Sequence, residues 1–214
     1  MASLFRTFQF TDEFIKFDHD KVKTKEIDKD GKKSMVGYVT LKMTALQIGD
    51  DRNDRMVAPF GLSGLYPGEK EEYTRNLELL ITSDALQGKI REMDAFFQAT
   101  FQANSRSWFK KVKKLEYVSP LKETEHGLAV TVKVYITGHK DPTKVKLFDS
   151  DLDPSEWEDG SAEDLNPGSD SLVMIKPDNL WFNENKYGVV LKAKMIVVKR
   201  GTGRRSYGLE DMLL

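Results

Sequence analysis

The sequence predicts a β-rich α+β protein. Alternation of apolar and polar residues with a period of two dominates the chain, one segment has helical spacing, and the connections between these segments are long and charged. The chain shows none of the strand–helix–strand alternation that builds a doubly wound parallel sheet. At 214 residues it can close one hydrophobic core. We therefore expect an OB-like Greek-key β-barrel with one central helix, a long acidic loop and a flexible C-terminal tail.

Four segments carry the alternation of half-buried strands. Their inward residues are predicted to be Val39, Leu41, Met43 and Ala45 in 36–46; Leu77, Leu79 and Ile81 in 73–82; Val130, Val132, Val134 and Ile136 in 128–137; and Leu191, Ala193, Met195 and Val197 in 187–199. Asp30 and Gly31 precede the first of them and predict a hairpin turn. The outward faces then carry Lys, Thr or Tyr.

One segment has the three- and four-residue spacing of an amphipathic helix. Its inward residues are predicted to be Leu86, Ile90, Met93, Phe97 and Phe101. Asp84 stands before them as an N-cap, with Gln87 three residues later as in a capping box. The helix is expected to end near Ala103 and Asn104.

Composition excludes several classes of protein. The chain has no cysteine, so it has no disulfide framework, no Cys-ligated zinc or iron–sulfur site and no thiol nucleophile. No run approaches the roughly 18 apolar residues of a membrane span, and the N-terminus lacks the apolar stretch of a signal peptide. We expect a soluble intracellular protein.

The near-neutral charge is a cancellation between segments. The chain has 33 Lys and Arg against 34 Asp and Glu, a net charge of −1. Segment 105–146 has ten basic and four acidic residues, and segment 176–205 has eight and two. Between them, 147–175 has nine acidic and no basic residues. Two cationic segments therefore flank one anionic segment, and the total does not exclude a polyanionic ligand.

The densest cationic run is 105–114, SRSWFKKVKK. It combines two adjacent rings with four lysines: Trp108, Phe109, Lys110, Lys111, Lys113 and Lys114. Lysines neutralise phosphates and rings stack on bases, at about 1–3 kcal/mol per base, and both are needed to bind a nucleic-acid single strand. The alternative is that either ring packs into the core below a solvated lysine face.

The outward faces of three predicted strands also combine lysine with tyrosine. The candidates are Tyr38 with Lys42, Lys133 with Tyr135, and Lys192 with Lys194. If these strands are neighbours, their outward faces form one groove in which lysines contact phosphates and rings stack on bases. The alternative is an ordinary polar sheet surface.

The acidic segment 149–170 is predicted to be a long solvated loop. Asp149, Asp151 and Asp153 suggest a calcium loop, but Pro154 and Gly160 stand where an EF-hand needs Gly and Glu. We interpret the segment as a mobile polyanion that either binds a partner or occupies the cationic groove until nucleic acid displaces it.

No pattern predicts catalysis. His19, His126 and His139 are isolated, and no serine has the context of a nucleophile elbow. We expect no enzymatic activity, no cofactor and no metal site. Residues 1–199 are predicted to form one OB-like nucleic-acid-binding domain and residues 200–214 a flexible tail, in which Arg204 and Arg205 add non-specific attraction.

Several short motifs carry a resemblance to a known family. They are Met56–Ser63 (MVAPFGLS), Asp94 within the helix, Ser107–Lys110 (SWFK), Leu180–Phe182 (LWF) and Lys186–Gly188 (KYG). Over 36–199 this pattern resembles the OB-fold single-stranded DNA-binding proteins of large nucleocytoplasmic DNA viruses. Phe60 in the first motif is expected to pack into the core from a turn.

The resemblance implies sequence-independent binding of single-stranded DNA in replication, repair or recombination, in the nucleus or a cytoplasmic replication site of a host cell. The tail ending looks like the acidic tips by which such proteins contact replication proteins, although it has only two acids and ends in two leucines. Its candidate partner-binding residues are Leu209, Glu210, Asp211, Leu213 and Leu214.

The sequence therefore favours a non-catalytic single-strand binder. Tyr38, Trp108 and Tyr135 are the expected base-stacking residues. A scaffold protein that acts through its acidic loop and tail tip, and an RNA-binding module of the same shape, remain alternatives.

Overall fold

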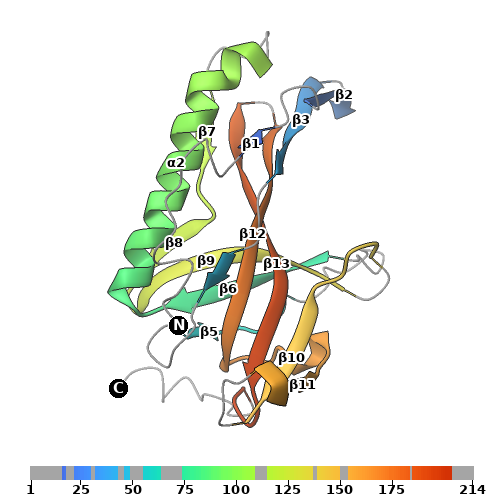
Figure 1. The fold of residues 1–214 in the computed structure, drawn as a ribbon. Coiled ribbons are helices and arrows are strands. Elements are labelled where there is room, and N and C mark those ends of the chain that lie inside the picture. The colour runs from blue at the N-terminus through green and yellow to red at the C-terminus, as the bar shows by residue number, and fades with distance from the viewer. Residues whose placement is uncertain are drawn as a thin grey trace.

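The computed structural model describes residues 16–17, 22–29, 32–42, 46–48, 55–63, 74–108, 115–136, 139–149, 154–183 and 185–203. Within them five strands close a barrel (Figure 1): β5 (Met56–Ala58), β6 (Thr74–Ile81), β9 (Gly127–Tyr135), β13 (Lys186–Lys199) and β12 (Ser169–Asn183). Each pairs with the next in that order, and β12 also pairs with β5, which closes the ring. Only the β9–β13 pair of the ring is parallel. This mostly β architecture with one described α-helix is consistent with an OB-like fold.

The inward faces of β6 and β9 confirm the predicted alternation. Leu77 pairs with Val132 and Leu79 with Val130, and all four side chains are fully buried. Because side chains alternate across a strand, the residues between them point out of the barrel. The apolar face of each strand thus fixes which lysines and tyrosines reach the surface.

The longest strand, β12, is absent from the predicted set. Pro177 and Asp178 interrupt its alternation, and proline is found at bulges or edges of sheets because it cannot donate a ladder hydrogen bond. In the structure a register shift between Pro177 and Asn179 absorbs this interruption, so Leu180 and Phe182 point into the core.

A second register shift corrects the predicted face of β13. Met174 and Ile175 of β12 pair with Met195 and Ala193, so Lys194 is an extra residue in β13. Leu191 and Ala193 face the main core as expected, but Ile196 and Val198 follow them there. Met195 and Val197, predicted to share that face, instead belong to a second small cluster with Phe148 and Leu172.

The β12–β13 hairpin continues beyond the barrel and carries further strands. β3 (Lys32–Lys42) pairs with β12, and β2 (Lys23–Lys29) pairs with β3. Lys29 pairs with Lys32, which confirms the hairpin predicted around Asp30 and Gly31. Two short strands, β1 (Lys16–Phe17) and β4 (Leu46–Ile48), pair with β3 and β12.

Four more strands extend the sheet from β13 and β9. β7 (Glu116–Val118) and β10 (Lys144–Phe148) run parallel to β13, while β8 (Leu121–Thr124) pairs with β9. β11 (Glu158–Asp159) lies within the acidic segment and pairs with β10. Two 3₁₀ turns, Pro154–Glu156 and Ala162–Asp164, flank β11. The described part of this segment therefore has short elements within the predicted loop, and most of its side chains are exposed or half-buried.

The helix α2 (Asp84–Trp108) connects β6 to β7 and runs along one side of the molecule, from the barrel to the far end of the hairpin (Figure 1). Its predicted inward residues are all buried. The helix begins at Asp84, and the Ser83 carbonyl accepts the Gln87 N–H at 2.9 Å, so the cap lies one residue earlier than predicted. The Gln87 side chain donates to the Ile81 carbonyl at 2.9 Å, which secures the strand–helix turn.

The helix continues four residues beyond its predicted end because an aromatic cluster holds its last turn. Phe101 stacks on Tyr187 with ring centroids 3.8 Å apart and meets Trp108 edge-on at 5.8 Å. Trp108 is 7% exposed. The expectation that Trp108 stacks on bases is thus corrected, because its ring is packed in the core.

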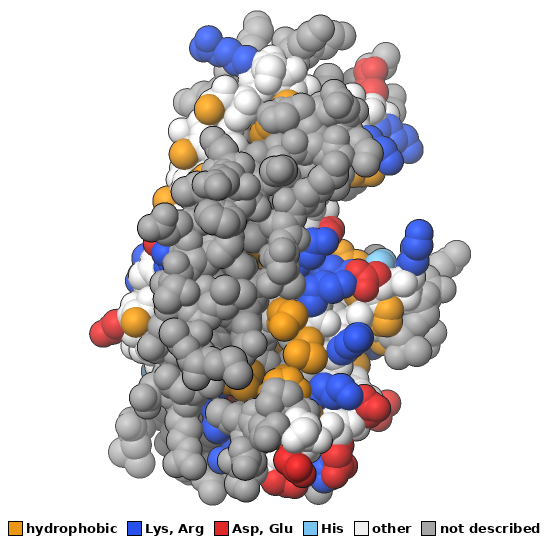
Figure 2. All heavy atoms as spheres, in the orientation of Figure 1, with side chains coloured by type: hydrophobic (Ala, Val, Ile, Leu, Met, Phe, Trp, Pro, Cys, Tyr) orange, Lys and Arg blue, Asp and Glu red, His pale blue; other side chains and the backbone are white. Residues whose placement is uncertain are grey.

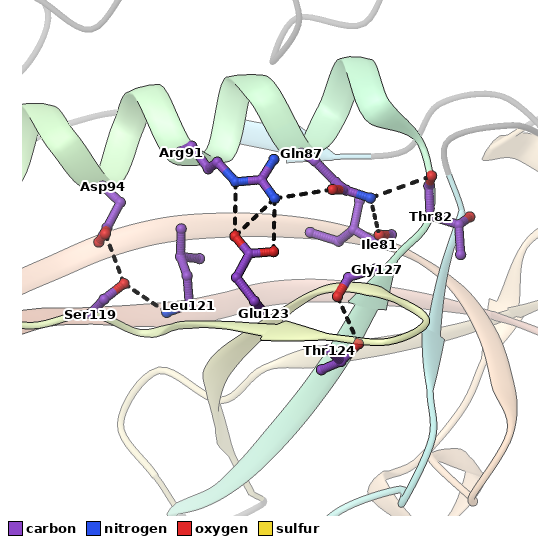
Figure 3. Close-up of polar contacts among 10 residues, drawn as sticks. All are labelled: Ile81, Thr82, Gln87, Arg91, Asp94, Ser119, Leu121, Glu123, Thr124 and Gly127. Carbon is purple, nitrogen blue, oxygen red and sulfur yellow. Dashed lines mark hydrogen bonds and ion pairs between the residues drawn. The ribbon is translucent and has the colours of Figure 1, made fainter.

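Polar contacts hold the first half of α2 against β7 and β8 (Figure 3). The Arg91 guanidinium donates to both carboxylate oxygens of Glu123, at 2.9 and 3.0 Å. The Ser119 hydroxyl donates to Asp94 at 2.7 Å, and the Tyr117 hydroxyl donates to the other oxygen. Burial raises the pKa of Asp94, an effect that these two hydrogen bonds oppose.

The Phe101→Ala variant should lower the free energy of unfolding by about 3–5 kcal/mol, because it leaves a cavity beside Tyr187 and Trp108. Phe60→Ala is the matched control. Phe60 is 68% exposed, which corrects the expectation of a core residue, and its removal should change the free energy by less than about 0.5 kcal/mol. Urea denaturation measures both; a Phe60 loss as large as the Phe101 loss would contradict this packing.

Candidate nucleic-acid interface

A row of polar side chains crosses four barrel strands on their outward face. Asn76 of β6 pairs with Lys133 of β9, Lys133 pairs with Lys192 of β13, and Lys192 pairs with Lys176 of β12. We call these four residues the lysine row: Asn76, Lys133, Lys192 and Lys176. Barrel closure creates it, since the parallel pair of Lys133 and Lys192 joins two strands far apart in sequence. On the face that Figure 2 shows, several Lys and Arg side chains lie next to hydrophobic side chains, beside an indentation of the surface.

Lys192 is the buried member of this row. The sequence predicts that Lys192 lines the groove, and the structure places it on this face, where it is only 4% exposed. Its ammonium donates to the Asp141 backbone carbonyl at 2.8 Å and to the Asp141 carboxylate at 3.0 Å. The same ammonium lies 3.9 Å from the centre of the Tyr135 ring. A buried ammonium needs such partners, because an unpaired buried charge is costly.

Asp141 also pairs with Lys194, whose ammonium donates to it at 2.6 Å. The Asp141 side chain is 58% exposed, and hydrogen bonds from Lys194 and Lys192 lower its pKa to about 2. Thr143 fixes the loop that carries it, because its hydroxyl donates to the Ala193 carbonyl at 2.6 Å and accepts the Tyr135 N–H at 3.0 Å. One exposed carboxylate thus neutralises two lysines of the face.

A second row lies further along the hairpin on the same face. Trp181 of β12 pairs with Tyr38 of β3 and with Gly188 of β13, which in turn pairs with Val118 of β7. We call these four residues the aromatic row: Tyr38, Trp181, Gly188 and Val118. Tyr38 is 39% and Val118 38% exposed, and the Lys23 ammonium lies 5.7 Å from the Tyr38 ring centre. The two rows lie four positions apart along β13, about 13 Å of strand.

The indole of Trp181 lies against the backbone of Gly188. A Cβ at Gly188 would meet two indole carbons at 3.0 Å and the Val118 carbonyl oxygen at 2.6 Å. The glycine therefore allows the ring to lie close to the strand. Its inward neighbour Tyr187 stays in the core.

A pocket of about 220 Å³ lies between the two rows. Trp181, Val118, Pro120 and Val190 contribute apolar surface, and Asn76, Thr131, Ser119 and Lys133 contribute polar groups; Val132, Val189 and Leu191 complete the lining. Asn76 and Thr131 are exposed, and Lys133 is half-buried. The pocket thus joins the aromatic row to the lysine row.

The structure brings five predicted site residues to this face: Tyr38, Lys133, Tyr135, Lys192 and Lys194. Of Lys42 it gives the strand position but not the side chain. The remaining candidates lie outside the described residues: Phe109, Lys110, Lys111, Lys113, Lys114, Arg204, Arg205, Leu209, Glu210, Asp211, Leu213 and Leu214.

Sequence reasoning missed three contributors to the face. Lys176 lies in the unpredicted strand, and Asp141 acts across 51 positions of sequence, for which the sequence offers no signal. Trp181 is part of the LWF motif but received no role. The alternation of buried Leu180 and Phe182 around it was the signal that it points outward.

The acidic segment is paired elsewhere. Its Asp159 accepts from Lys146 at 2.6 Å, Asp170 accepts from Arg55 at 2.9 Å, and Arg200 donates to Glu158. Leu165 of the same segment is buried in the main core. For the described part, the interpretation that this segment occupies the cationic groove is therefore wrong, while the alternative that it binds a partner stays a prediction. Asp141 supplies the counter-charge of the face.

The described ranges contain no group of three or more metal-ligating side chains, and no helix among them is long and apolar enough to cross a membrane. His126 and His139 lie in turns. His139 contacts the Tyr135 ring at 4.3 Å between ring centres.

No protein-family model matches the chain, and no curated protein matches it. Two solved structures are similar to it in fold. One is the single-stranded DNA-binding protein of bacteriophage Enc34 in complex with ssDNA, with a TM-score of 0.47 and 12% identity over 88% of this chain and 99% of that one. The other is gp2.5, a single-stranded DNA-binding protein encoded by bacteriophage T7, with a TM-score of 0.43 and 14% identity over 74% and 92%.

The carboxyl of Asp141 should titrate near pH 2, well below the usual value of about 3.9, because two lysines stabilise its ionised form. Since the folded-state pKa is the lower one, the contact stabilises the fold above pH 4 and is lost as the pH falls through about 2. NMR titration of the Asp141 carboxyl carbon tests this. Lys194→Gln should raise the midpoint; an unchanged midpoint near 4 in the wild type would contradict the pairing.

Proposed function

We propose that this protein binds single-stranded DNA without sequence specificity, along the face that carries the lysine row and the aromatic row. The observation that carries the proposal is their juxtaposition: the half-buried Lys133 and Lys176 lie on the same outward face as the exposed Tyr38 ring and the half-buried Trp181 ring. Lysines bind the phosphate backbone of any sequence, and every base has a face on which a ring can stack.

A single strand fits this face better than a duplex does. Tyr38 and Trp181 offer ring surface to bases, but the bases of a duplex are already stacked and paired. The face has no described helix that could enter a major groove, because α2 packs on the other elements through its buried residues. Tyr135 and Tyr38 are the candidate stacking residues that the sequence predicted, and Trp181 joins them.

The lysine run 110–114 and the basic arm at Arg204 and Arg205 would add phosphate contacts from outside the described residues. The proposal includes no catalytic step. DNA replication, repair or recombination are the processes that expose single strands, and the tail tip at 209–214 is the candidate contact for replication proteins in a host cell, as the resemblance to viral single-strand binders implies.

Fluorescence anisotropy with oligo-dT, oligo-U and duplex DNA at low and moderate salt tests the proposal. We expect oligo-dT to bind most tightly, with a steep loss of affinity as salt rises. No binding of any ligand at low salt would refute the proposal. Tighter binding of oligo-U would replace DNA with RNA as the ligand, because phosphate contacts and stacking occur with both.

The double variant Lys133→Gln, Lys176→Gln should weaken oligo-dT binding and reduce the slope of log affinity against log salt by about 0.7 per lost phosphate contact. Lys89→Gln on α2 is the matched control, since Lys89 pairs with Glu92 at 2.7 Å away from the face. It should leave the slope unchanged. An effect of Lys89→Gln half as large as that of the double variant, in proportion to the one and two charges removed, would mean that total charge, and not the lysine row, sets the affinity.

Asp141→Asn should strengthen oligo-dT binding roughly threefold to tenfold at low salt. The carboxylate competes with phosphate for the partly exposed Lys194, and a surface ion pair of this kind contributes up to about 1 kcal/mol, whereas the buried Lys192 keeps the Asp141 backbone carbonyl and the Tyr135 ring as partners. The Asp159→Asn variant, which releases Lys146 on β10, serves as the control. Weaker binding by Asp141→Asn would show that the carboxylate orders the lysines rather than screens them.

A further inference from the structure

The pocket between the two rows has the form of a receptor for one flat ring. The indole of Trp181 provides one wall, and Val118 and Pro120 provide surface across from it on another element. Its volume of about 220 Å³ equals the space of about seven waters, which suits a single heterocycle. The pocket is open to the surface on which Tyr38 and Val118 are exposed.

Both walls are held in place before any ligand arrives. The Pro120 carbonyl accepts the Thr131 N–H at 3.0 Å, and the Ser119 hydroxyl accepts the Leu121 N–H at 3.0 Å while it donates to Asp94 at 2.7 Å (Figure 3). On the other side the indole lies against Gly188. A ligand would therefore lose little free energy to ordering of the protein.

The polar groups of the pocket match the edge of a base. The Asn76 amide can donate and accept, and so can the Thr131 hydroxyl, so together they can pair with the donors and acceptors of different bases. Such groups are compatible with the sequence-independent binding proposed above. They also disfavour a purely apolar occupant, since its entry would leave them unpaired.

The cation next to the pocket indicates that the bound ring carries a phosphate beside it. Lys133 belongs both to the pocket lining and to the lysine row, directly beside Lys192. A ring in the pocket is thus within reach of the Lys133 ammonium, which can bind a phosphate next to it.

We propose that this pocket receives one unstacked base of the bound single strand, with Trp181 as its stacking partner and Asn76 and Thr131 at its edge. The inference rests on the proposed function and adds to it a site at which the strand is fixed by a base. The other bases stack on exposed rings or face solvent, so the pocket sets the position of the backbone relative to the lysine row.

An abasic oligonucleotide, which keeps the phosphates and lacks every base, separates the contribution of the base pocket to the affinity from that of the phosphate contacts. Trp181→Ala should weaken oligo-dT binding at least fivefold and change the affinity for the abasic strand less than twofold. Lys133→Gln should weaken both strands by the same factor. Trp181→Phe, which keeps a stacking ring, should restore most of the oligo-dT affinity and shows that the Ala effect is not a folding defect.

The chain has three tryptophans, so a Trp108→Phe, Trp157→Phe variant reports on Trp181 alone. Oligo-dT should quench its fluorescence, and the abasic strand should not. If Trp181→Ala lowers the affinity for oligo-dT and for the abasic strand equally, or if both strands quench the fluorescence equally, the base pocket is refuted while single-strand binding stands. If the wild type binds neither strand at low salt, the proposed function itself fails.

Discussion

Closure of the barrel through the parallel pairing of β9 with β13 is the constraint on which the rest of the structure depends. It brings Lys133 next to Lys192, although they are 59 positions apart in sequence, and it encloses the apolar face of each strand in the interior. The outward residues are then ordered in rows by the register of the ladders. The lysine row, the aromatic row and the pocket between them all follow from that register.

Charge on this protein is organised locally. The acidic segment and the basic segments cancel in the total, but three described acids of 154–170 pair with basic residues away from the lysine row: Asp170 with Arg55, Asp159 with Lys146 and Glu158 with Arg200. The counter-charge of the lysine row comes from Asp141, in a loop whose own segment is basic overall. Salt and water screen Coulomb interactions between exposed charges. Proximity after folding, and not the net charge of a segment, therefore decides which groups neutralise each other.

The sequence predicted the inward faces of β6 and β9 and the buried stripe of α2 well, because Leu77, Val132 and Phe97 occupy strict periods. It failed at β12, where Pro177 breaks the alternation that a register shift restores in three dimensions. It also failed for the rings: Trp108 is buried and Phe60 exposed, the reverse of what each motif suggested. A single aromatic residue carries no periodicity, so its exposure depends on its neighbours in the fold.

By itself the sequence determined the strands' periods, the helix and the two cationic segments, because these follow from local order along the chain. Only the tertiary structure decided that the charge cancellation visible in the composition is irrelevant to the face, that Asp141 and not the described part of the acidic segment neutralises it, and that Trp181 lies near Lys133. These contacts join residues 40 to 60 positions apart, and long-range proximity is set by strand register and barrel closure, which no local pattern encodes.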